Sequence, residues 1–160
     1  MSALVLVHVL ISLIAIVTGI VVMFRMLGSN RVSRLTSTFL ATTILTSVTG
    51  FFIPPFLYQK FLPSHAIGIV SLVLLVIACY AMYSMRLSGM WRWVYVLTAL
   101  VSLYLNCFVL VIQTFLKVPA LHAIAPGEPP AGPVFGAVQI IVLAFFALMT
   151  FRAIKRFRPA

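Results

Sequence analysis

The sequence predicts an all-α integral membrane protein, a bundle of five transmembrane helices that forms a single domain over residues 1–160. Of the 160 residues, 64% are hydrophobic and only 8% are charged. A soluble domain normally carries about 25% charged residues, so this chain has too few to cover a surface in water. A mean hydropathy of +1.24 leads to the same prediction. The length leaves room for one membrane domain and no soluble one.

Five apolar stretches are long enough to cross a hydrocarbon core about 30 Å thick, which needs roughly 20 helical residues. The first has no basic leader and no small-residue cleavage site, so we expect it to remain as a helix. Pro54 and Pro55 remove two amide donors and should bend or end the second span. A loop rich in proline, over residues 117–133, should precede the last. The predicted spans are 4–24, 35–57, 65–83, 93–115 and 134–151.

Basic residues predict the orientation of the bundle, because short cytoplasmic loops carry an excess of Lys and Arg. Nine of the 11 fall on one side, and only Lys60 and Lys117 fall on the other, together with Glu128. The N-terminus is therefore expected outside and the C-terminus in the cytoplasm, in a bacterial inner (plasma) membrane. The net charge of +10 belongs to these loops, so no nucleic-acid partner is expected. The nine are Arg25, Arg31, Arg34, Arg86, Arg92, Arg152, Lys155, Arg156 and Arg158.

The three histidines lie near the expected outer face and are evenly spaced along the chain. His8, His65 and His122 are 57 residues apart each time (65 − 8 and 122 − 65). The segments Ser-His-Ala-Ile-Gly and Leu-His-Ala-Ile-Ala around the second and third are also alike. This pattern raises the hypothesis of a duplicated two-helix unit in which His8 and His65 are equivalent.

Two histidines at similar depth on different helices are what the iron of a b-type haem needs, and imidazole also binds other transition metals. His8 and His65 are the expected haem ligands. Asn106 and Gln139 would supply hydrogen bonds around the cofactor. In a second interpretation, His122 and Glu128 complete a transition-metal site with the same two histidines. Haem b and a metal ion thus both stay open as cofactors.

A polar stripe on the fourth span has two interpretations. Thr98, Ser102, Asn106 and Gln113 fall within about 80° of arc on a helix. They can be hydrogen-bonding contacts between packed helices. Alternatively, Asn106 and Gln113 line an outer cavity with Thr49 and Gln139. No span contains Asp or Glu, which disfavours ion-coupled transport and proton pumping. Hydrolase motifs are missing from the sequence, so enzymatic activity is not expected.

The pattern of spans, with His8 and His65 near the outer end of two inward-running helices, resembles small bacterial inner-membrane proteins of the cytochrome b561 type. The resemblance implies b haem held between histidines on facing helices, here His8 and His65. Three functions stay open. The protein is a haem- or metal-binding redox protein, a non-catalytic accessory or assembly subunit of a larger membrane complex, or a small-solute or lipid-handling protein. Its expected partners are the lipid bilayer and, in the second case, other membrane subunits.

Overall fold

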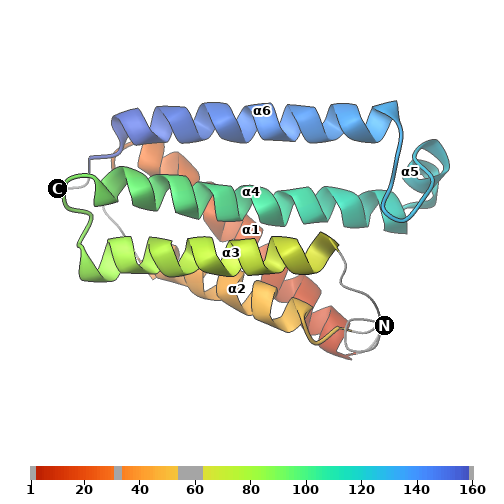
Figure 1. The fold of residues 1–160 in the computed structure, drawn as a ribbon, viewed down its shortest axis with the longest axis horizontal. Helices are drawn as coiled ribbons and strands as arrows, with labels where there is room; N and C mark the ends of the chain where they lie inside the picture. The colour runs from red at the N-terminus through yellow and green to blue at the C-terminus, as the bar shows by residue number, and fades with distance from the viewer. Residues whose placement is uncertain (1–2, 31–33, 54–62, 159–160) are drawn as a thin grey trace.

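The computed structural model describes residues 3–30, 34–53 and 63–158 of the chain. These residues are helical without any strand, and they form a bundle of long helices with one short helix at an end (Figure 1). In chain order the elements are α1 (Ala3–Leu27), α2 (Arg34–Gly50), α3 (Pro63–Cys79) with a π-helical turn η1 (Tyr80–Ser84), α4 (Trp91–Lys117), α5 (Pro119–Ile124) and α6 (Pro133–Arg156).

The long helices run back and forth along one axis. α1 begins at one end of the bundle and α6 finishes at the opposite end (Figure 1). α1 packs along α2, α3 along α4, and α4 along α6, while α2 also contacts α3. α1 reaches α4 and α6 as well, so α4 is in contact with every other long helix.

Within the described residues, four segments are long and apolar enough to cross a membrane, namely α1, His65–Ser84, α4 and α6. The prediction of an all-helical protein with apolar helices long enough to span a membrane is therefore confirmed, but the expected count of five spans is not supported. The predicted second span corresponds to α2, which is not among these four segments; it has 17 residues and is rich in Ser and Thr. Its helix ends at Gly50 and gives way to a turn at residues 51–53. The sequence predicted a span as far as 57, but the part of that prediction from Pro54 onward lies outside the described residues. Residue 53 precedes Pro54, and a proline disfavours helical backbone in the residue before it.

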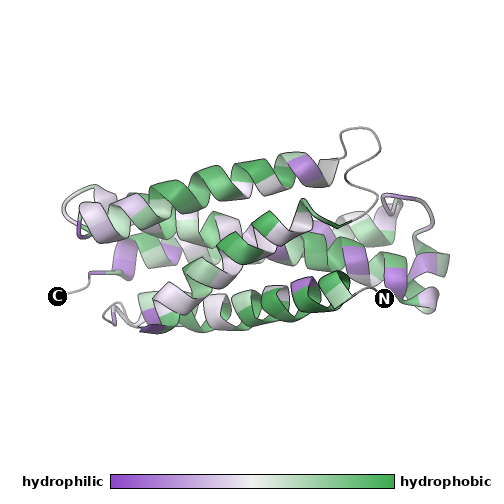
Figure 2. Ribbon diagram, turned by 90° about the horizontal axis from the view of Figure 1, so that it is seen from below, coloured by the Kyte–Doolittle hydropathy of each residue, from purple (hydrophilic) through white to green (hydrophobic). Residues whose placement is uncertain are grey.

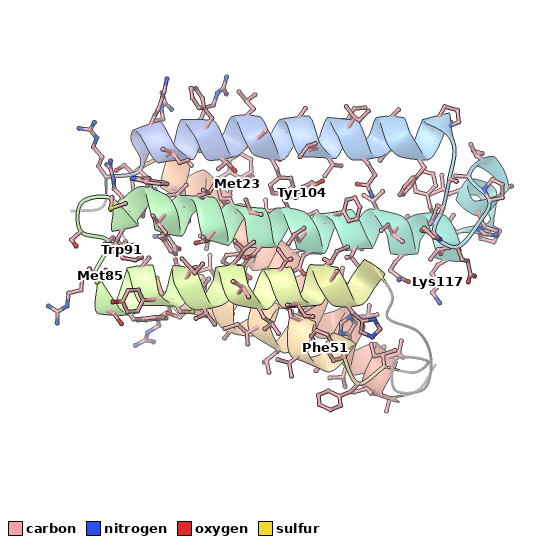
Figure 3. All side chains as sticks on the ribbon, viewed as in Figure 1. Met23, Phe51, Met85, Trp91, Tyr104 and Lys117 are labelled. Carbon is pink, nitrogen blue, oxygen red and sulfur yellow. The ribbon has the colours of Figure 1, made fainter. Side chains whose placement is uncertain are left out.

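The tightly packed core lies toward the end of the bundle where α1 finishes and α2 begins. Tyr95, Phe39 and Met23 are among the largest fully buried side chains. In Figure 3 the labelled Met23 and Tyr104 lie in the layer between α4 and its neighbours. By contrast, large apolar side chains such as Val76, Ile140 and Ile141 are two-thirds exposed. Green residues line the helices along their length in Figure 2, as expected for surfaces that meet lipid.

α1 crosses its neighbours most closely at Gly19. A methyl group added there would lie 2.5 Å from Leu103 Cδ1 and 2.7 Å from Phe39 Cε2. Both of these side chains are completely buried. The lack of a side chain at Gly19 therefore lets α1 approach α2 and α4 at a distance that no other residue would allow.

Charged residues are distributed unevenly between the two ends. The basic end, as we call it, carries Arg25 in the last turn of α1, Arg34 at the start of α2, the arginines of the α3–α4 connection and the basic residues of the last turn of α6. The opposite end, called here the histidine end, has Lys117 and Glu128 among its described residues. Figure 3 places Met85 and Trp91 at the first end and Lys117 at the second. Arg31 and Lys60 lie outside the described residues.

The proline-rich loop expected over residues 117–133 contains a short helix, α5, which packs against α4. Gly127 and Gly132 follow with φ values of 113° and 118°, a backbone conformation that residues with a side chain rarely adopt. These glycines let the chain turn sharply, so that α6 starts beside the end of α4.

Candidate functional site

The clearest polar contact between helices at the histidine end joins α1 to α2. His8 Nδ1 lies 2.8 Å from Thr49 Oγ1. The Thr49 hydroxyl already donates to the Leu45 carbonyl, at 2.7 Å, so its oxygen is left as the acceptor for the ring. In the neutral imidazole, Nδ1 then carries the proton and Nε2 keeps its lone pair. His8 is thus held in the tautomer that presents Nε2 as a donor atom for a ligand.

The end of α2 lies between His8 of α1 and His65 of α3. A methyl group built on Gly50 would be 3.5 Å from His8 Cε1, so the His8 ring lies over the backbone there. The ring of the next residue, Phe51, is tilted by 33° to the ring of His65, and the two ring centroids are 6.1 Å apart. Two consecutive residues of one helix end therefore contact the two histidines that the sequence analysis paired.

Small residues bring α2 and α3 close together beside these rings. A methyl group on Gly68 would lie 3.0 Å from the Phe51 ring, which is labelled beside the start of α3 in Figure 3. One turn further along, Ser47 donates to Ser71 at 3.4 Å. His65 itself is 9% exposed, so its ring is held by packing rather than projecting into lipid.

His122 and Glu128 are not brought to the same place. His122 lies in α5, which packs on α4, and its Nδ1 is buried without a hydrogen-bond partner in the described part of the chain. Glu128 is exposed in the loop that follows. Within residues 3–30, 34–53 and 63–158, no three His, Cys, Asp or Glu side chains are grouped so that they could hold a metal ion. The expected four-residue metal site is therefore not assembled here.

Asn106 and Gln139 were expected to support the histidines, and the structure gives Gln139 a different contact. Its side-chain nitrogen donates to the Phe108 carbonyl at 3.2 Å, which ties α6 to α4. The Asn106 side-chain nitrogen and the Gln139 side-chain oxygen are buried, and neither has a hydrogen-bond partner among the residues described. Buried polar atoms without a partner are costly, by about 1–3 kcal/mol each.

The polar stripe on α4 does not line an open path. Thr98 and Ser102 are buried, and their hydroxyls donate to carbonyls of the same helix at 2.8 and 2.9 Å. Gln113, further along, is exposed. The two best-formed hollows in the described residues lie elsewhere, at the basic end and on the outer side of α1, and no histidine lines either of them.

The even spacing of the histidines pairs His8 with His65, but it does not indicate the residues that lie between them. The sequence predicts Phe51 only as part of the span 35–57, and it predicts Thr49 as a lining residue of an outer cavity rather than as the partner of His8. No sequence pattern indicates these contacts, because they depend on which faces of α1, α2 and α3 meet when the helices pack. Comparisons with protein families, with curated proteins and with solved structures found no match to this chain.

Proposed function

We propose that the protein is a five-span membrane protein that holds a redox metal centre, haem b or a transition-metal ion, between His8 and His65 near its outer face. One observation carries the proposal. His8 is fixed by Thr49 in the tautomer that leaves Nε2 as the donor. Histidines that bind metals typically donate their other ring N–H to such a partner.

The chemistry of the donor set favours haem over a lone ion. Haem iron takes four nitrogens from the porphyrin and needs two ligands from the protein, whereas a structural zinc site needs four. The pair His8 and His65, from α1 and α3, has no carboxylate beside it, because Glu128, the only acid in the chain, is in the loop after α5. A bound haem would supply one-electron transfer at the outer leaflet, and the histidines would position and hold it.

The proposed topology includes α2 as a short fifth span. Its two ends make contacts at opposite ends of the bundle, Thr49 with His8 and Ser37 with Tyr83, the latter at 2.9 Å. Seventeen residues extend about 25 Å, a little less than the hydrocarbon core. The hydroxyls along α2 donate to carbonyls one turn back, for example Thr43 to Phe39 at 2.7 Å, which lowers the cost of placing them in lipid.

The uneven charge then supports an orientation. With the basic end in the cytoplasm, the N-terminus is outside and both histidines are near the outer face. This arrangement fits a bacterial inner membrane, where short basic loops remain on the cytoplasmic side.

An accessory subunit is the second candidate function. It is favoured by the hydroxyls of α2 and α4, which are mostly satisfied within their own helices and so serve close packing. A solute-handling protein is the third candidate. The two hollows do not separate it from the haem protein, because they include neither its expected lining residues, Thr49, Asn106, Gln113 and Gln139, nor the two histidines.

The test is to purify the protein in mild detergent and record reduced-minus-oxidised visible spectra, with metal analysis of the same sample. The proposal predicts a b-type band or a stoichiometric metal that is lost in His8→Ala and in His65→Ala. His122→Ala is the matched control and should keep the b-type band or the bound metal. A colourless, metal-free protein that copurifies with another membrane protein would support the accessory role instead.

A further inference from the structure

A small polar cavity lies at the basic end, far from the histidines. Its volume is about 10 Å³, the room for one water-sized sphere, and it is partly open to the outside. Four polar side chains from different parts of the chain line it, and the rest of the lining is apolar. They are Arg25, Asn30, Thr36 and Tyr95.

Tyr95 is the most deeply buried of the four polar side chains. The side chain is 1% exposed, and its hydroxyl is buried without a hydrogen-bond partner among the described residues. A buried tyrosine hydroxyl normally has a partner, because leaving it without one is costly. The cavity that it lines is therefore the place where a partner atom would sit.

The side chains that line the cavity favour the binding of an anionic oxygen atom. Arg25 is a permanent cation with several N–H donors, and Asn30, Thr36 and Tyr95 can each donate a hydrogen bond. The only acidic residue of the chain, Glu128, lies at the other end of the bundle. A phosphate is the common oxyanion that arginine binds, and one of its oxygens is about the size of a water molecule.

A second hollow lies on the same helix, toward the middle of the bundle. It has a volume of about 260 Å³ and is lined by Leu13, Ile14, Val17 and Thr18. Ile14 is 49% exposed and Val17 61% exposed, so this surface faces the lipid. At about 100° per residue, Ile14, Thr18 and Arg25 fall within about 40° of arc, so these three lining residues share one face of α1, while the other α1 residues of the two hollows lie to opposite sides of that face.

The distance between the two hollows matches a lipid. Thr18 and Leu13 are about 10 and 18 Å from Arg25 along the helix axis. One leaflet of the hydrocarbon core is about 15 Å thick. A phospholipid whose phosphate lies at Arg25 therefore has acyl chains that reach the apolar hollow. From this arrangement we infer that α1 carries a specific binding site for a glycerophospholipid of the leaflet at the basic end, with its phosphate at Arg25, Asn30 and Tyr95.

The test measures the thermal unfolding of the purified protein in detergent with three added probes. Dioleoylphosphatidylglycerol has both the phosphate and the chains, dioleoylglycerol has the chains alone, and inorganic phosphate has the charge alone. The inference predicts a rise in the unfolding temperature with the first probe and little change with the other two. Equal stabilisation by dioleoylglycerol would reduce the site to an apolar contact. Equal stabilisation by inorganic phosphate would make it a site for a free anion.

Variants locate the effect. Arg25→Gln should weaken the binding of phosphatidylglycerol about tenfold or more, because it removes a charge-assisted hydrogen bond. Arg86→Gln, which removes an exposed charge from another loop at the same end, is the matched control and should bind as the parent does. Equal losses in the two variants would show a general attraction to anionic lipid and overturn the inference.

Tyr95→Phe gives a second readout that does not depend on Arg25. Without lipid this variant should unfold at a higher temperature than the parent, because it lacks the hydroxyl that has no partner. Phosphatidylglycerol should raise the unfolding temperature of this variant by less than it raises that of the parent. An unchanged gain would mean that the hydroxyl does not contact the lipid, and would contradict the placement of the phosphate. Size-exclusion profiles of all the variants show whether each one is folded.

Discussion

The crossing of α1 over α2 and α4 at Gly19 makes a prediction about stability that can be worked from the structure. In Gly19→Ala the new methyl group would lie 2.5 Å from Leu103 Cδ1 and 2.7 Å from the Phe39 ring. Both side chains are fully buried and have little room to move. Overpacking of this kind costs about 1–3 kcal/mol. The higher helix propensity of alanine returns up to about 1 kcal/mol.

The net loss expected for Gly19→Ala is therefore about 1–2 kcal/mol, which corresponds to a fall of about 2–8 °C in Tm for a chain of this size. Gly136→Ala is the matched control. Gly136 is also helical, but a methyl group there would have no neighbour within 4 Å, so only the gain in propensity, up to about 1 kcal/mol, should appear. The assay is thermal unfolding in detergent followed by circular dichroism. Equal Tm values for the two variants would refute the close crossing of α1.

Three further substitutions test individual contacts. Thr49→Val removes the acceptor for His8 Nδ1 but keeps the shape of the side chain. The affinity for metal or haem, measured by spectroscopic titration, should fall about 10–100-fold with little change in Tm. An unchanged affinity would mean that Thr49 does not orient a ligand. Asn106→Leu removes a buried donor that has no hydrogen-bond partner among the described residues, and it should raise the free energy of unfolding by about 1 kcal/mol. A lower free energy of unfolding would show that Asn106 has a partner in the working protein. Tyr83→Phe removes the 2.9 Å bond to Ser37 at the other end of α2, and a fall in the free energy of unfolding by about 1 kcal/mol or less is expected, whereas a rise would argue against that contact.

Much of the fold could be predicted because lipid imposes a simple rule on the chain. Apolar runs long enough to cross the membrane mark α1, α4 and α6, and the structure places helices there. The second helix was harder, because its Ser and Thr residues lower its hydropathy while their hydroxyls are satisfied within the helix. The short helix α5 within the proline-rich loop was also not anticipated. Pro119 at its first turn is compatible with a helix start, where the missing N–H has no helical partner in any case.

Less of the candidate site could be predicted, because the site depends on how the helices pair. The even spacing of the histidines predicts that His8 and His65 are equivalent, and the structure puts both beside the end of α2. Depth alone also placed His122 and Glu128 nearby, but the packing of α5 on α4 carries them elsewhere. The roles of Thr49 and Phe51 follow from the rotation of α2 about its axis, which the sequence pattern does not determine when both faces of a helix contain hydroxyls.

The central claim is that His8 and His65 act together as the two protein ligands of one metal centre. The most direct measurement is a titration of the purified, cofactor-free protein with haem b, followed at the Soret band and counted per chain. The account predicts one haem per chain in the parent protein and in His122→Ala, and none in the double variant His8→Ala/His65→Ala. Equal haem binding by the parent and the double variant would contradict this claim. A parent protein that binds neither haem nor a metal ion would also contradict it.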